Sequence, residues 1–276
     1  MNKLVLRGVN ATGVEGLPHA TLRFFDPNPQ PSLVMTQIRA LVFDVFGTVV
    51  DWRNGIAREA APFLKKWGRT DIDPIAFSDA WRGRYQPSME EIRSGRRPYC
   101  RLDVLHRENL SYVLQYFGIE EAAISEQELV SLNKAWHRLD AWPDVVAALD
   151  RLKPHYILGP LSNGNISLMV NLARHAKLPW EVVLGAEITH AYKPSPQAYL
   201  RAVEALDLPH AEVCLVAAHN SDLRAARSCG LSTAFVPRPD EYGSHEKADL
   251  KADSEWDVIA TDFTDLADQL LVGKSA

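Results

Sequence analysis

A carboxylate followed by Gly and Thr comes directly after an apolar run near the start of the chain. The run covers residues 38–43, Asp44 follows it, and Gly47 and Thr48 come shortly afterwards. An Asp side chain is charged at neutral pH, so it can act as a nucleophile without a separate base. We therefore take Asp44 as the candidate nucleophile. Thr48 either donates a hydrogen bond to the Asp44 carboxylate or only stabilises the turn.

Polar side chains also follow later apolar runs that are predicted to be strands. They are Ser162, Asn163, Lys193, His219 and Asp222. A single residue of this kind is typical of a turn or a helix cap. The carboxyl ends of parallel strands meet at one edge of a sheet, however, so we expect these side chains to share one crevice with Asp44. There Lys193 would keep Asp44 ionised, unless Lys193 is a solvated surface lysine.

The elements that would hold these residues alternate between strands and helices in the second half of the chain. Apolar runs predict strands at residues 38–43, 155–161, 181–184, 213–218 and 233–236. Helical stripes lie between the later strands, and we expect Asp144 to cap one of these helices. This alternation predicts an α/β fold, a doubly wound Rossmann-like parallel sheet with right-handed crossovers.

A block of helical patterns without a convincing strand occupies residues 52–141. The helices are expected at residues 56–67, 77–81, 102–117 and 126–139. We interpret this block as a helical cap domain inserted into a discontinuous core made of residues 35–51 and 142–276. Residues 1–34 have scattered Gly and Pro and no sustained period, so they are expected to be a peripheral extension, and a start codon chosen too far upstream would explain them.

The composition excludes several classes of function. The formal net charge of −5 over 276 residues makes nucleic acid and an anionic membrane surface unexpected partners. The chain lacks a run of about 18 apolar residues that could span a membrane. Its 3 cysteines are too few for a disulfide framework or a zinc site and fit a reducing cytoplasm. Residues 217–222 contain a single acid, Asp222, where a hard cation would need further carboxylate ligands, so we expect no metal and no other cofactor.

The segments Asp44–Thr48, Leu161–Gly164 and Tyr192–Pro194, together with Asp222, resemble motifs of the haloacid dehalogenase superfamily. The resemblance is strongest to the L-2-haloacid dehalogenases. In the superfamily's phosphatases the second residue after the nucleophile is usually an acid, whereas Phe46 stands there in this chain. The resemblance implies hydrolysis of short, haloacetate-type 2-haloacids to 2-hydroxyacids through an aspartyl-ester intermediate. Its small-molecule partners would be the haloacid and the released halide.

The resemblance also implies how the substrate and the halide are bound. Ser162 and nearby backbone amides would hold the substrate carboxylate. Asn163 and an arginine of the cap would receive the departing halide, which needs a cation or an amide dipole. The candidates are Arg82, which we slightly favour, and Arg84, and either could instead lie on a solvated helix face.

Some positions carry two interpretations. Phe46 and Trp81 either line a dry apolar pocket or belong to the core. His219 stands where many L-2-haloacid dehalogenases have Asn. It either orients or deprotonates the hydrolytic water together with Asp222, or it is satisfied by backbone groups at a helix N-terminus.

Two other functions compete with dehalogenation. A phosphatase or phosphonate hydrolase on the same scaffold is disfavoured by Phe46 and by the lone acid Asp222. A binding module that keeps the fold without catalysis is disfavoured because every charged motif position is occupied. The apolar cap helices would suit a homodimer, and the sequence leaves the halide preference open.

Overall fold

The computed structural model describes residues 37–243 and 248–274 of the chain. Its contacts divide the chain into a unit of Met1–Met35 and a unit of Thr36–Ala276. The extension expected at residues 1–34 lies outside the described residues. Within the described ranges, every helix is too short or too polar to cross a membrane.

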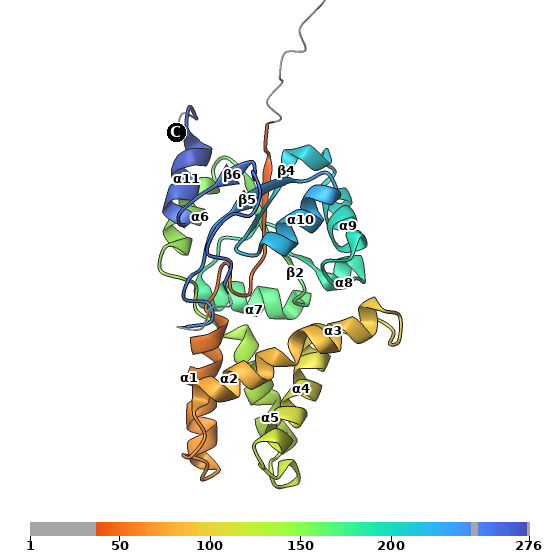
Figure 1. The fold of residues 1–276 in the computed structure, drawn as a ribbon, viewed down its shortest axis with the longest axis vertical. Helices are drawn as coiled ribbons and strands as arrows, with labels where there is room; N and C mark the ends of the chain where they lie inside the picture. The colour runs from red at the N-terminus through yellow and green to blue at the C-terminus, as the bar shows by residue number, and fades with distance from the viewer. Residues whose placement is uncertain (1–36, 244–247, 275–276) are drawn as a thin grey trace, which may run out of the picture. The chain divides into compact units, whose positions relative to one another are not determined.

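A parallel sheet is the centre of the unit Thr36–Ala276 (Figure 1). Its strands are β1 (Ala40–Phe43), β2 (Ile157–Ser162), β3 (Leu184–Gly185), β4 (Val213–Ala217), β5 (Ser232–Phe235) and β6 (Val258–Ile259). They lie in the order β3-β2-β1-β4-β5-β6, and each adjacent pair is parallel. The chain winds outward from β1 in both directions, so the ligand crevice of such a sheet is expected between β1 and β4. The predicted doubly wound fold is confirmed.

Helices cover both faces of the sheet. Leu41 and Phe43 pack on one face with residues of α6, α7 and α11. Ala40 and Val42 pack on the other face with residues of α9 and α10. Successive side chains of a strand point to opposite faces, so a strand that is covered on both sides must be apolar throughout. The helices of the core are α6 (Val145–Leu152), α7 (Ile166–Ala176), α8 (Ala186–Thr189), α9 (Pro196–Leu206), α10 (Asn220–Ser228) and α11 (Phe263–Leu271), with the 3₁₀ turn η3 (His210–Glu212).

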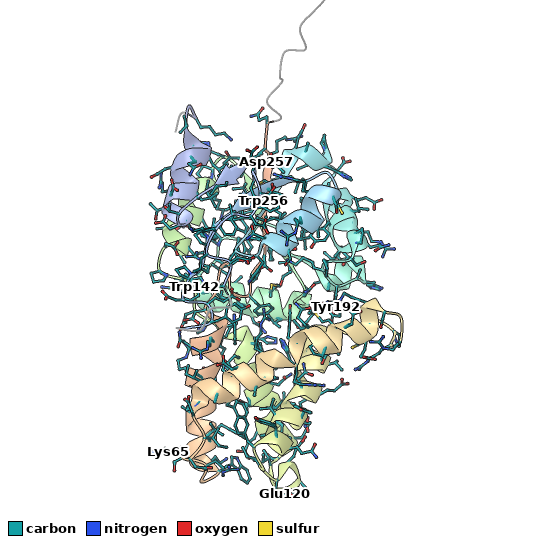
Figure 2. The ribbon with its side chains drawn as sticks, viewed as in Figure 1. Lys65, Glu120, Trp142, Tyr192, Trp256 and Asp257 are labelled. Atoms are coloured by element: carbon teal, nitrogen blue, oxygen red, sulfur yellow. The ribbon has the colours of Figure 1, made fainter. Side chains whose placement is uncertain are left out.

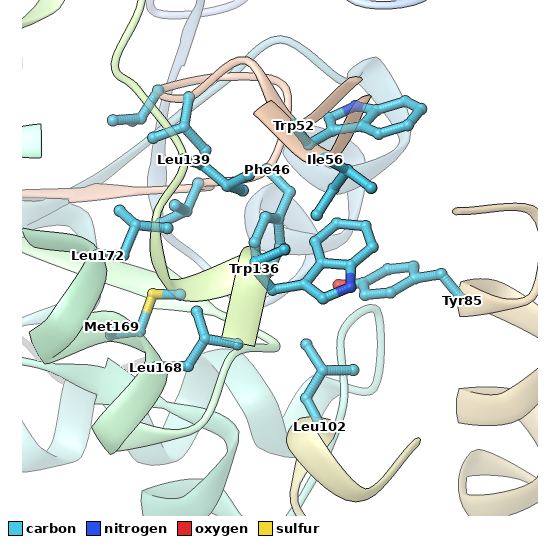
Figure 3. Packing of buried hydrophobic residues seen from close by; sticks show 14 of the residues in the cluster. Phe46, Trp52, Ile56, Tyr85, Leu102, Trp136, Leu139, Leu168, Met169 and Leu172 are labelled. Carbon is cyan, nitrogen blue, oxygen red and sulfur yellow. The ribbon is translucent and has the colours of Figure 1, made fainter. Parts of the chain in front are cut away.

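The helices between β1 and α6 form the helical cap (Figure 1). Figure 3 shows Phe46, which follows β1, beside Trp136 and Tyr85 of the cap. The Phe46 ring meets the Trp136 ring edge to face at a centroid distance of 5.7 Å, a favoured geometry for aromatic pairs. The cap consists of α1 (Trp52–Lys66), α2 (Pro74–Gly83), α3 (Tyr85–Arg93), α4 (Leu102–Tyr116), η1 (Glu121–Ala123), α5 (Glu126–Asn133) and η2 (Lys134–His137).

Two aromatic side chains hydrogen-bond the segments that surround the expected crevice (Figure 2). The Trp142 indole donates to the carbonyl of Gly47 at 2.8 Å. The Tyr192 hydroxyl donates to the carbonyl of Cys100 at 2.7 Å and so joins the core to the segment before α4. These bonds satisfy loop carbonyls and hold the loops against their neighbours.

The structure differs from the predicted elements at several places. The strand predicted at 181–184 pairs only as β3, because the amides of Glu181 and Val182 both reach the carbonyl of Leu158 in an irregular turn. The helix predicted at 126–139 ends at Asn133, where that side chain donates to the backbone of α4. Helix α3 and the short strand β6 were not predicted.

Asp144 stands at the N-cap position of α6, as predicted, but its side chain makes no capping hydrogen bond. Its carboxylate accepts two bonds of 2.9 Å from Arg238 Nη1 and one of 2.9 Å from the amide of Phe263. Arg238 in turn donates from Nε to the carbonyl of Thr48 at 2.9 Å. The Asp144–Arg238 pair therefore supports the loop that follows Asp44, and a sequence pattern cannot reveal a pair so distant in the chain.

Replacing Asp144 with Ala should lower the free energy of unfolding by about 3–5 kcal/mol, because a buried guanidinium would lose its carboxylate. The Arg238 side chain is only 9% exposed. Urea denaturation measures the change. The control is Asp268→Ala, which removes an exposed carboxylate from Arg151 and should cost less than about 1 kcal/mol. Equal losses in the two variants would contradict a special role for the buried pair.

Candidate active site

A cavity of about 250 Å³ opens at the carboxyl edge of the sheet. Asp44 follows β1, Asn163 follows β2, and His219 and Asp222 follow β4 at the start of α10. Lys193 comes from the segment between α8 and α9. The walls of the cavity include Asp44, Asn163, Lys193, His219 and Asp222 from the core and Arg82 from the cap. Most of the polar residues predicted to converge thus lie around one space, at the β1–β4 crevice.

Both oxygens of the Asp44 carboxylate have hydrogen-bond partners. Oδ1 accepts from Lys193 Nζ at 2.9 Å, and Oδ2 accepts from Thr48 Oγ1 at 2.8 Å. Oδ2 also lies 2.9 Å from His219 Nδ1. Burial by itself raises the pKa of Asp44, but Lys193 and His219 outweigh it and hold that pKa well below its ordinary value. Asp44 is therefore ionised at neutral pH, as a nucleophile must be.

Lys193 lies between two carboxylates. Its Nζ donates to Asp222 Oδ2 at 2.5 Å as well as to Asp44, and the Tyr199 hydroxyl donates to Asp222 Oδ1 at 2.5 Å. Burial disfavours the ammonium, but Asp222 and Asp44 raise the pKa of Lys193 above its ordinary value. The Lys193 side chain is buried, so it is not the solvated surface lysine of the alternative interpretation. Tyr199 was missed because it looks like an ordinary core position of its helix.

Thr48 combines the two interpretations of its hydroxyl. It donates to Asp44 Oδ2 and accepts from the amide of Ala218 at 2.9 Å. A hydroxyl can donate one hydrogen and still accept another. Thr48 therefore orients the carboxylate and connects the loop after β1 to the end of β4.

Ser162 and Asn163 differ in their position around the cavity. The Asn163 carbonyl oxygen accepts from the amide of Lys193 at 2.7 Å, and Asn163 lines the cavity. Ser162 Oγ accepts from the amide of Gly164 at 3.1 Å, and Ser162 is not among the lining residues. This contact is the one expected if Ser162 only stabilises a turn. In this arrangement it shapes the turn that presents Asn163.

His219 forms a pair with a carboxylate that the sequence analysis did not single out. Its Nε2 lies 2.9 Å from Glu241 Oε2, while Nδ1 faces Asp44. Asp222 accepts instead from Lys193 and Tyr199, and the joint action of His219 and Asp222 on a water stays a prediction. Burial lowers the pKa of His219, but Glu241 and Asp44 raise it well above the ordinary value. Glu241 was missed because it lies beyond the predicted strands and outside any motif.

The two candidate arginines of the cap have different surroundings. Arg82 lines the cavity with its guanidinium 4.0 Å from the centroid of the Tyr85 ring and 5.2 Å from that of Trp52. Its Nη1 is buried and has no hydrogen-bond partner among residues 37–243 and 248–274. Arg84 instead stacks on Tyr112 at 4.2 Å and is not a lining residue. Arg82 therefore offers an uncommitted cationic donor to the cavity, and Arg84 does not face it.

The two aromatic candidates also separate. Phe46 lines the cavity and is almost fully buried. Trp81 is completely buried, donates from its indole to the carbonyl of His106 at 3.0 Å, and is not a lining residue. Trp81 thus belongs to the core of the cap, whereas Phe46 forms an apolar wall where a phosphatase would have its second acid.

The described residues show no group of three or more His, Cys, Asp or Glu side chains arranged around a metal position. The Asp44 and Asp222 carboxylates, which are the groups a hard cation would use, both contact the Lys193 ammonium. Metal independence stays a prediction for experiment.

Known proteins resemble this chain in sequence and in structure. The profile of the haloacid dehalogenase-like hydrolases matches residues 38–230. (S)-2-haloacid dehalogenase 4A of Burkholderia cepacia is 29% identical over 242 residues, 85% of this chain and 100% of that protein. (S)-2-haloacid dehalogenase 1 of Pseudomonas sp. (strain CBS-3) is 31% identical over 217 residues, 75% of this chain and 89% of that protein.

A solved structure extends the similarity. The crystal structure of the defluorinating L-2-haloacid dehalogenase Rha0230 superposes with a TM-score of 0.83 and 52% sequence identity. The match covers 84% of this chain and 95% of that one. With the doubly wound sheet, the inserted cap and the Asp44 site, these matches show that the chain belongs to the haloacid dehalogenase-like hydrolase family.

Proposed function

We propose that the chain hydrolyses short 2-haloacids to 2-hydroxyacids, with Asp44 as the covalent nucleophile. One observation carries the proposal. A buried, ionised carboxylate shares a small cavity with an arginine donor that has no partner among the described residues, and Phe46 occupies the place of a second acid. The relatives named 2-haloacid dehalogenases support the same activity.

The first step is displacement of the halide. An Asp44 oxygen attacks the halogen-bearing carbon, a carbon–oxygen bond forms, and the carbon–halogen bond breaks with its electron pair on the halide. Lys193 keeps the carboxylate charged until it attacks. Arg82 and the Asn163 amide stabilise the departing anion, and the aromatic rings around Arg82 exclude water that would weaken this interaction. Attack from the side opposite the halide inverts a chiral carbon.

The second step is hydrolysis of the Asp44 ester. Water attacks the ester carbonyl carbon, the hydroxyacid leaves, and the Asp44 carboxylate is restored. The attacking water gives up one proton, so this step needs a general base close to Asp44. The family resemblance implies that Ser162 and nearby backbone amides hold the substrate carboxylate. Because Ser162 does not line the cavity, the backbone amides of the turn that it shapes are our candidates for this role.

The substrate panel for this enzyme starts with haloacetates. A cavity of about 250 Å³ suits a small acid, and Arg82 and Lys193 favour an anion. Because the 52% identical relative is a defluorinating enzyme, fluoroacetate belongs in the panel beside chloroacetate.

We further propose that the enzyme works in the cytoplasm, because a reducing compartment suits its free cysteines Cys100, Cys214 and Cys229. We also propose that it forms a homodimer, which light scattering would test.

Isotope placement tests the covalent route. A single turnover in ¹⁸O-water with enzyme in excess should put the label on Asp44 and give unlabelled hydroxyacid, because the product oxygen comes from the side chain. Mass spectrometry of the Asp44 peptide and of the product gives both results. Labelled product with unlabelled Asp44 would mean direct attack by water and would overturn the nucleophile while leaving the family unchanged.

The two cap arginines form a matched pair of variants. Arg82→Ala should lower kcat for chloroacetate by about 10²-fold or more, the usual loss when one electrostatic donor is removed. Arg84→Ala should lower it much less, because Arg84 stacks on Tyr112 outside the cavity. Steady-state halide release measures both. The opposite ranking would assign the halide to Arg84.

Chelation tests metal independence. Halide release should survive exhaustive treatment with EDTA, because the Lys193 ammonium already neutralises the carboxylates that a hard cation would need. Phosphate release from an aryl phosphate is the parallel assay. Activity that is lost with EDTA and restored by magnesium, together with phosphate release, would favour the phosphatase.

A further inference from the structure

His219 lies between the candidate nucleophile and a second, deeply buried carboxylate. Its Nδ1 is 2.9 Å from Asp44 Oδ2 and its Nε2 is 2.9 Å from Glu241 Oε2. The Glu241 side chain is only 1% exposed. Its other oxygen accepts from the Trp52 indole at 3.1 Å. Glu241 is therefore held rigidly behind the imidazole, on the side opposite Asp44.

We propose that His219 is the general base for hydrolysis of the Asp44 ester and that Glu241 is its positioning residue. This inference rests on the proposed haloacid hydrolysis, and it assigns a general base to the ester-hydrolysis step, for which no base has been named so far. A carboxylate behind an imidazole fixes which ring nitrogen faces the reaction, and it stabilises the imidazolium formed when that nitrogen takes a proton.

Among the groups near Asp44, His219 is better placed for this step than the other acid. Asp222 accepts hydrogen bonds from Lys193 at Oδ2 and from Tyr199 at Oδ1, whereas His219 Nδ1 faces Asp44 directly. Lys193 is an ammonium held by two carboxylates and has no lone pair to accept a proton. His219 Nδ1 is within hydrogen-bond distance of a carboxylate oxygen that is attached to the carbon which water attacks.

The backbone of the loop after β1 leaves space for the Glu241 carboxylate at Gly47. Gly47 has a φ of +91°, and a Cβ placed there would lie 2.1 Å from Glu241 Oε1. Only glycine allows the loop after β1 to take this conformation and to leave room for the carboxylate. The same Gly47 that turns the chain after Asp44 thus admits the acid that supports His219.

The charge of Asp44 controls when His219 can act. In the free enzyme, Asp44 and Glu241 both favour the imidazolium and raise the pKa of His219. Ester formation removes the charge of Asp44, so one of these two anions is lost. The proposed step then requires the Nδ1 proton to pass to solvent, to which the 24% exposed His219 side chain has access. Neutral His219 then faces a neutral ester, which is the arrangement that hydrolysis requires.

The protons balance over the whole cycle. Water adds its oxygen to the Asp44 carbonyl carbon and gives one proton to Nδ1. The bond from this carbon to the substrate oxygen breaks, and the second water proton passes from the added oxygen to that leaving oxygen, which becomes the hydroxyl of the product. Asp44 returns as a carboxylate and His219 as an imidazolium. One halide ion and one proton are released for each haloacid and water consumed.

Glu241→Gln tests the inference, because glutamine keeps the shape and an acceptor for Nε2 but removes the charge. With chloroacetate, the first halide should be released at a rate near that of the wild type. The ester should then decay about 10²-fold more slowly, the usual scale of general-base catalysis. Rapid quenching followed by mass spectrometry should show a carboxymethyl group on the Asp44 peptide, a signal that a loss of stability alone would not produce.

The control is Asp103→Asn, which makes the same type of change at another buried histidine pair. Asp103 Oδ1 lies 2.9 Å from His137 Nε2, and neither residue lines the cavity. This variant should form and hydrolyse the ester at wild-type rates. If Glu241→Gln fails to fold, His219→Gln takes its place and should accumulate the same ester.

Two results would overturn the inference. One is wild-type ester decay in Glu241→Gln, and the other is equal slowing of ester formation and ester decay. Failure of the proposed function looks different, because the wild-type enzyme would then release no halide from any haloacid of the panel.

Discussion

The site depends on keeping one carboxylate ionised where water is largely excluded. Burial alone would raise the pKa of Asp44 and favour its protonated, non-nucleophilic form. Lys193 and His219 prevent this, but Lys193 is buried and His219 is partly buried, so each positive charge needs an anion of its own. Asp222 pairs with Lys193, and Glu241 pairs with His219. The polar network thus follows from a single requirement, because a buried charge without a partner would cost several kcal/mol.

The fold meets this requirement by collecting chain ends at one edge of the sheet. The residues that follow parallel strands all lie at the carboxyl edge of the sheet, and the direction of winding reverses between β1 and β4. Asp44 and His219 therefore meet although they are far apart in the chain. Arg238 then fixes the loop after Asp44 through the carbonyl of Thr48, and Asp144 satisfies this arginine. Both the supporting pair and the polar cluster around Asp44 are therefore bonded to Thr48 of this short loop, the pair through its carbonyl and Asp44 through its hydroxyl.

The cap completes the cavity with a different kind of interaction. Arg82 is held by the faces of aromatic rings, so its guanidinium is positioned without a carboxylate among the described residues. An ion pair would have occupied its donors and cancelled its charge toward a departing halide. Phe46 and Tyr85 belong to the same aromatic cluster, which connects the core loop to the cap and keeps that side of the cavity apolar.

The sequence by itself determined the sheet, the helical insertion and the residues at the strand ends, because burial periodicity and turn chemistry are local. It also determined Asp44, Lys193 and the absence of an acid at Phe46. Only the tertiary structure showed that Arg82 lines the cavity and Arg84 does not, since neighbouring residues of a helix face different directions. It alone paired His219 with Glu241, because partners such as Trp52 and Glu241, 189 residues apart, are brought together by packing and leave no pattern in the chain.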